Sequence, residues 1–159
     1  MLKVKDIMTR QVLTVSPETT VKEAAVLLAE KAISGVPVLK GDKIVGIFSE
    51  SDVLRSIKMT RKDLRLVYPS VSPLGVAFQE EVTQREILEA YSEAGKMPVG
   101  EVMTKDVVTV DPEMTVKDAV LKMMDRSINR LPVLDKGLLV GIVTRGDIIR
   151  GLAKERPTI

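Results

Sequence analysis

The hydrophobic and polar positions of this chain follow one pattern twice. Residues 4–57 recur without a gap as residues 99–152, so nearly every position has a counterpart 95 residues later. In each copy, apolar residues spaced three and four apart predict an amphipathic helix. The two helices begin at capping-box patterns, Thr20-x-x-Glu23 and Thr115-x-x-Asp118. Their apolar stripes contain Val21, Ala24, Ala25, Leu28 and Ala32 in the first copy and Val116, Ala119, Val120, Met123 and Ser127 in the second.

Short apolar runs on either side of each helix predict strands. One strand is expected before the helix, at residues 12–15 and again at 107–110, where Pro17 and Pro112 end the run. Two more strands follow as a hairpin around a Gly-containing turn, at 36–39 and 44–48 and again at 131–134 and 138–143. A last short helix is expected to begin near Ser49 and near Thr144. The predicted order is therefore β-α-β-β-α, twice.

A supersecondary unit built twice predicts the domain organisation. Each copy alone is too small to bury much apolar surface, so the two are expected to pack on each other about a pseudo-twofold axis, with clefts between them. The fold class is mixed α/β (α+β). The expected segments are a first motif at 1–57, a connecting segment at 58–98 and a second motif at 99–159.

The connecting segment has no counterpart in the repeat. Pro69 and Pro73, together with neighbouring serines and a glycine, predict an ordered loop over residues 61–78. The pattern Thr83-x-x-Glu86 predicts a helix that ends at Gly95. So long a connection inside a compact domain indicates that the segment packs against the module, and a simple tether is the alternative.

The amino-acid composition excludes several kinds of functional site. The chain has no Cys and no His, so disulfides, thiolate chemistry and the commonest metal ligand are excluded, and no metal site is expected. Only 3% of residues are aromatic and the net charge is +2, so nucleic-acid binding is not expected. No signal-peptide pattern or long apolar run predicts secretion or a membrane span, and a soluble cytoplasmic protein is expected.

Three duplicated motifs resemble the paired cystathionine-β-synthase (CBS) domain, or Bateman module. They are the opening MT-x-x-V-x-TV-x-P, the strand (G/R)-(V/L)-PV and the closing G-I-(F/V)-(S/T)-x-x-D, in the same order in both copies. The resemblance implies two units packed as one module. It also implies that an adenosyl ligand such as AMP, ADP, ATP or S-adenosylmethionine binds in the clefts, and that modules pair into homodimers.

The resemblance also implies two composite sites, each joining the opening segment and strand start of one copy to the last strand and helix of the other. A carboxylate such as Asp52 or Asp147 would accept hydrogen bonds from both ribose hydroxyls, and phosphate would lie near the helix start. The residues of the first site are Thr9, Leu13, Ile33, Ser34, Gly35, Ile142, Thr144 and Asp147. Those of the second site are Thr104, Val108, Ile128, Asn129, Arg130, Ile47, Ser49, Ser51 and Asp52. Only the second site has a guanidinium, that of Arg130, at the position where the first has Gly35.

A structural role competes with ligand binding at the same positions. Ser49-x-x-Asp52 and Thr144-x-x-Asp147 are also typical helix caps, and Thr9 and Thr104 are also typical turn residues. The favoured hypothesis is a regulatory module without catalytic activity or required cofactor, which binds an adenine nucleotide and acts on an unknown partner protein. The alternatives are a scaffolding CBS module without a ligand and a nucleic-acid-associated regulator. On the favoured hypothesis, Asp52→Ala or Asp147→Ala removes nucleotide binding and changes folding little.

Overall fold

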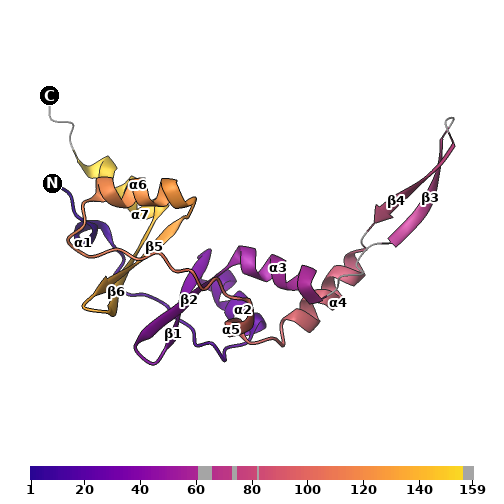
Figure 1. Ribbon diagram of the computed structural model, residues 1–159, viewed down its shortest axis with the longest axis horizontal. Helices are drawn as coiled ribbons and strands as arrows, with labels where there is room; N and C mark the ends of the chain where they lie inside the picture. Colours follow the sequence, from indigo (N-terminus) through magenta and orange to yellow (C-terminus); the bar gives the residue numbers. More distant parts are fainter. Residues whose placement is uncertain (61–65, 73–74, 82, 156–159) are drawn as a thin grey trace. The chain divides into compact units, whose positions relative to one another are not determined.

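The computed structural model describes residues 1–60, 66–72, 75–81 and 83–155, and the side chains of 1–60 and 83–155 (Figure 1). The chain divides into two compact units, and each unit takes residues from both sequence copies. Unit 1 contains residues 1–15, 36–47 and the chain from Lys105 onward. Unit 2 contains residues 16–35 and 48–104.

The two copies form the same elements in the same order. Each has a four-residue helix, a longer helix, a two-stranded antiparallel hairpin and a closing helix, which confirms a duplicated mixed α/β fold. In the first copy these are α1 (Val4–Ile7), α2 (Val21–Lys31), β1 (Gly35–Lys40), β2 (Lys43–Ser49) and α3 (Glu50–Thr60). In the second they are α5 (Val99–Val102), α6 (Val116–Arg126), β5 (Arg130–Asp135), β6 (Leu138–Thr144) and α7 (Arg145–Lys154).

The predicted helix starts are confirmed. The Thr20 hydroxyl accepts from the Glu23 N–H while the Glu23 carboxylate accepts from the Thr20 N–H. At the start of α6 the Thr115 hydroxyl accepts from the Asp118 N–H. Both helices end at a residue in the left-handed region, Ala32 at φ 51° and Ser127 at φ 52°. The two copies therefore share the helix ends as well as the apolar stripe.

The strand expected at residues 12–15 and 107–110 does not form. Only one residue of each segment makes a bridge, Val15 to Val38 and Val110 to Val133, both parallel. The four-residue helices α1 and α5 were not predicted, because a single helical turn has no measurable periodicity. The observed order in each copy is therefore α-α-β-β-α.

The connecting segment differs from its predicted structure in its first half. Its first half was predicted to be a loop, but it contains an antiparallel hairpin of β3 (Leu66–Ser72) and β4 (Gly75–Glu81). Pro69 lies within β3, which is compatible with a two-stranded sheet because both strands are edge strands. The predicted helix is confirmed as α4 (Gln84–Ala94), capped by Thr83 and ending at Gly95.

The leading segment of each copy docks on the other copy. In unit 1, Val4 N–H donates to the Met114 carbonyl at 2.9 Å, and Thr9 and Ile142 exchange two backbone hydrogen bonds of 2.9 Å each. Val4 is fully buried in a core with Leu131, Val133 and Val143. Thus residues 1–9 of the first copy complete the core of the second.

Unit 2 contains the reciprocal arrangement. The Val99 N–H donates to the Thr19 carbonyl at 2.7 Å, and the Gly100 N–H donates to the Pro17 carbonyl at 2.9 Å. Val99 is fully buried. The leading segment of the second copy, residues 96–104, therefore packs on the first copy.

An exposed ionic cluster also holds the first leading segment. Glu113 accepts from the ammonium groups of Lys3 and Lys5. These hydrogen bonds, that from Lys3 most of all, lower the pKa of Glu113 to about 2, and the bond to Glu113 raises the pKa of Lys5. The cluster favours the docked position of α1 at neutral pH.

Candidate functional site: the capping carboxylates

Asp147 lies in the first turn of α7 and is almost fully buried. Its Oδ2 accepts from the N–H and the hydroxyl of Thr144 at 2.9 and 3.0 Å, which closes a capping box. Its Oδ1 accepts from Thr9 Oγ1 at 3.1 Å and from Arg150 Nη2 at 2.7 Å. The carboxylate therefore joins the leading segment of one copy to the closing helix of the other, as the composite hypothesis requires.

Asp52 repeats this geometry in unit 2. It is 1% exposed, and its Oδ2 accepts from the N–H and the hydroxyl of Ser49 at 2.9 and 3.3 Å. Its Oδ1 accepts from Thr104 Oγ1 at 3.2 Å and from the Arg55 guanidinium. Arg55 also donates to the Val102 carbonyl at 2.7 Å, so it ties the carboxylate to α5.

Protein donors therefore fill the hydrogen-bond acceptor positions of both carboxylates. An ionised carboxylate offers about four acceptor positions, and four protein donors surround each of the two. A ribose hydroxyl would have to replace one of these donors or bind beside them. The expectation that Asp→Ala leaves folding almost unchanged is revised, because removal would leave several buried or half-buried donors without their acceptor.

No role was predicted for the two arginines, Arg55 and Arg150. The signal was present, since the repeated pattern is longer than S/T-x-x-D: Ser49, Asp52 and Arg55 correspond to Thr144, Asp147 and Arg150 at the same spacing. Residues three apart on a helix are neighbours, so an arginine at this position reaches the carboxylate. Arg55 and Arg150 remain about half and two-thirds exposed, so each presents charge to solvent beside a buried acid.

The remaining predicted residues are divided between the units. Unit 1 holds Leu13 and Ile142 of the first site together with Ile47, Val108, Ile128, Asn129 and Arg130 of the second. Unit 2 holds Ser51 of the second site together with Ile33, Ser34 and Gly35 of the first. Within unit 1, Arg130 pairs with Thr144 across the β5–β6 ladder. Its association with Asp52 stays a prediction.

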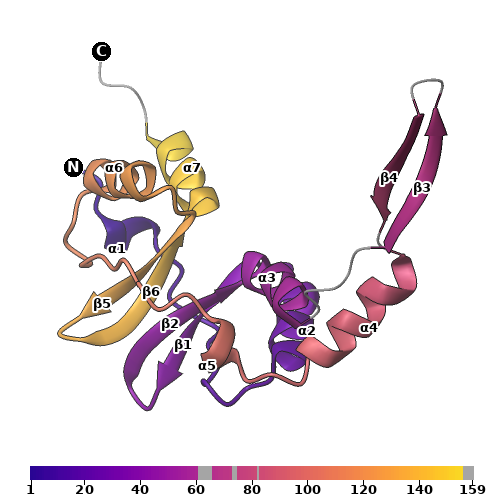
Figure 2. The same ribbon diagram turned by 45° about the vertical axis from the view of Figure 1, so that its right-hand side comes forward.

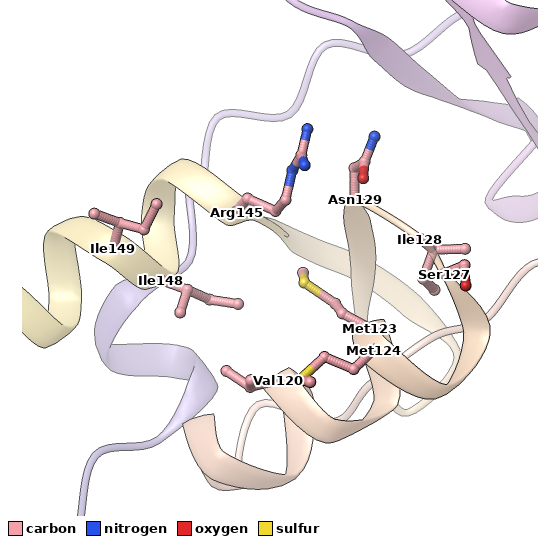
Figure 3. Close-up of a pocket in the computed structure, with 9 residues that line it drawn as sticks. All are labelled: Val120, Met123, Met124, Ser127, Ile128, Asn129, Arg145, Ile148 and Ile149. Carbon is pink, nitrogen blue, oxygen red and sulfur yellow. The ribbon is translucent and has the colours of Figure 1, made fainter.

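Unit 1 also contains an apolar groove between α6 and α7, with a volume of about 490 Å³. Two predicted residues, Ile128 and Asn129, line it. Figure 3 shows the apolar side chains of both helices around the groove, and Arg145 and Asn129 on its rim. The apolar wall is formed by Val120, Met123, Met124, Ile148 and Ile149.

In the described part of the chain, no three His, Cys, Asp or Glu side chains come together as a metal site would require. No helix of the same residues has the length and hydrophobicity to cross a membrane.

Comparison with known proteins establishes the family. The CBS domain family model matches residues 4–59 and again residues 99–154. The chain therefore belongs to the CBS domain family and carries two CBS domains in tandem.

Relatives and solved structures agree with this assignment. The uncharacterized protein MJ1426 of Methanocaldococcus jannaschii is 39% identical over 94% of this chain and 90% of its own length. The CBS domain-containing protein YhcV of Bacillus subtilis is 32% identical over 93% and 84%. A crystal structure of CBSX2 in complex with AMP matches with a TM-score of 0.70 and 27% identity, covering 97% of this chain and 98% of that one.

Proposed function

We propose that this protein is a regulatory adenine-nucleotide-binding module that acts on a partner protein in the cytoplasm and has no catalytic activity. The observation that carries the proposal is the Thr–Asp–Arg cluster, which occurs twice with the same hydrogen bonds. Membership of the CBS family and the likeness to a CBS protein crystallised with AMP support an adenosyl ligand.

Each group of the cluster has an expected role in binding. Thr9 and Thr104 are exposed and already donate to the carboxylates, so their hydroxyls can accept from a ribose hydroxyl without losing that bond. The guanidinium of Arg55 or Arg150 supplies permanent positive charge beside each acid and suits a phosphate oxygen. AMP, ADP or ATP is expected to bind at one or both clusters.

Adenine nucleotides are expected to raise the melting temperature of the purified protein. A ligand that binds only the native state at one hundred times its Kd stabilises it by about 2.7 kcal/mol. For a chain of this size that free energy corresponds to a rise of roughly 5–10 °C. Differential scanning fluorimetry with AMP, ADP and ATP measures the shift, and CMP is the matched control. The proposal is wrong if no adenine nucleotide shifts the transition at millimolar concentration, or if CMP acts equally.

We also propose a homodimer, because the helices of unit 1 expose large apolar side chains. Met124 is 70% and Ile149 is 67% exposed, and both line the groove of Figure 3. Exposed apolar surface of this kind indicates an interaction site. This observation also favours a scaffolding role, should nucleotides fail to bind.

Dimer formation is expected at micromolar concentration. Light scattering after size-exclusion chromatography should give twice the chain mass of 17.5 kDa. The variant Met124→Glu with Ile149→Glu should elute as a monomer, because charge would then line the groove. A wild-type monomer under these conditions would contradict the proposal.

A further inference from the structure

A second apolar groove of unit 1 lies where α6, α7 and the leading segment meet. Its volume is about 390 Å³, and among its lining residues Leu121 and Leu152 are about half exposed. The lining residues are Met1, Leu2, Val116, Lys117, Val120, Leu121 and Leu152. The nucleotide proposal uses none of them.

Unit 2 shows what covers the corresponding surface. By the 95-residue repeat, the groove residues correspond to the first turns of α2, the end of α3 and the start of the second leading segment. In unit 2, α4 packs against both α2 and α3 (Figures 1 and 2). Ala90 and Ala94 of α4 are fully buried there, so small side chains allow the close approach.

Backbone contacts show that the two surfaces are equivalent. The Val21 N–H donates to the Met97 carbonyl at 2.8 Å, and the Val116 N–H donates to the Leu2 carbonyl at 2.9 Å. One residue further, the Lys22 N–H donates to the Gly95 carbonyl at the end of α4, at 3.1 Å. A Cβ on Gly95 would lie 3.0 Å from the Lys22 Cβ, so α4 ends in close contact with α2.

Among the described residues, no helix covers the corresponding surface of unit 1. The described residues before α1, Met1 to Lys3, contain no helix. Within the described chain no backbone carbonyl accepts from the Lys117 N–H, whereas the Gly95 carbonyl accepts from the equivalent Lys22 N–H. Exposure reflects this difference: Leu152 is 52% exposed, whereas Ile57 at the same position in unit 2 is only partly exposed.

We propose that this groove binds an acidic amphipathic helix of a partner protein, in the way that α2 and α3 bind α4. The chain's own α4 defines the chemistry: Ala90 and Ala94, four residues apart, are buried where α4 packs in unit 2, and the helix carries three glutamates against one arginine. Lys117 and the positive end of α6 favour an acidic partner. The inference is independent of nucleotide binding.

A synthetic peptide of residues 83–95, with blocked ends, is the probe. It is added to the intact, methyl-labelled protein without nucleotide, and methyl chemical shifts are followed by NMR. We expect saturable shifts at Leu2, Val116, Leu121 and Leu152, with a Kd of about 0.1–1 mM because the isolated peptide must first form a helix. Added salt should weaken binding several-fold by screening the charges.

Matched variants locate the binding. Leu152→Glu should abolish the shifts, whereas Leu138→Glu, at an equally exposed leucine of β6, should leave them unchanged. A peptide with Ala94→Leu should bind at least several-fold more weakly, because a large side chain prevents close approach.

Three results would overturn the inference. The first is the absence of saturable shifts at the groove methyls with about 2 mM peptide. The second is equal binding by Leu152→Glu and wild type. The third is a set of groove shifts that appears on dilution of the variant Met124→Glu with Ile149→Glu, which does not form the proposed dimer, since a second copy of the chain would then occupy this groove.

Discussion

Replacing Phe48 with alanine is expected to lower the free energy of unfolding by about 3–5 kcal/mol. Phe48 is fully buried and is the largest side chain among the fully buried ones that the structure describes. Truncation removes its apolar contacts and leaves a cavity that close-packed neighbours fill only in part. The loss is a large fraction of the 5–15 kcal/mol by which a domain is usually stable.

Urea unfolding followed by circular dichroism measures the change. The melting temperature should fall by roughly 6–20 °C. Leu138→Ala is the control, because this leucine is 53% exposed and its truncation should change stability by no more than about 0.5 kcal/mol. A loss below about 1 kcal/mol for Phe48→Ala would show that the position repacks freely and has no defined core.

Removal of a capping carboxylate is the second large effect. Asp52→Ala and Asp147→Ala should each lower the free energy of unfolding by about 2–4 kcal/mol, since hydrogen bonds to charged groups contribute roughly 1.5–3 kcal/mol. The partly exposed arginines can be hydrated after the change, which limits the loss. Thermal unfolding should show a decrease of roughly 5–15 °C for each variant, and Asp42→Ala, in an exposed turn, should show almost none.

The same variants separate capping from ligand binding. Titration with AMP well below the melting temperature should show affinity reduced roughly 10- to 100-fold for a cluster that binds ribose. Unchanged affinity in the folded double variant would leave helix capping as the only role of these carboxylates. Equal stability of wild type and variants would contradict the hydrogen-bond geometry itself.

The repeat made most of the fold predictable. Helix starts follow local rules, so Thr20, Thr115 and Thr83 marked them correctly, and hairpins follow from short apolar runs around a turn. The failures lie where local rules are weak. Pro69 suggested a loop, although an edge strand tolerates proline, and the run at 12–15 has β-forming residues but only one bridging partner.

The candidate site was predictable in its residues but less so in its connections. Asp52, Asp147, Thr9 and Thr104 were identified from the repeated motifs, and the structure joins each threonine to the aspartate of the opposite copy. Spacing alone does not indicate which copy a leading segment joins, because this depends on long-range packing. The resemblance to the CBS domain pair implied the pairing. The hydrogen bond from an arginine to each carboxylate was missed, although Arg55 and Arg150 recur at the same spacing in the repeat.

The reciprocal docking of residues 1–9 and 96–104 has a consequence for how such a chain assembles. A single copy in isolation would keep its core incomplete and its own leading segment unsatisfied, so it is expected to swap that segment with a second molecule. Joining both copies in one polypeptide makes the swap intramolecular. The fraction of molecules with docked leading segments then depends on an effective concentration set by the linker and not on the protein concentration in solution. Since closure entropy rises only slowly with loop length, the linker can accommodate an inserted hairpin and helix at little thermodynamic penalty.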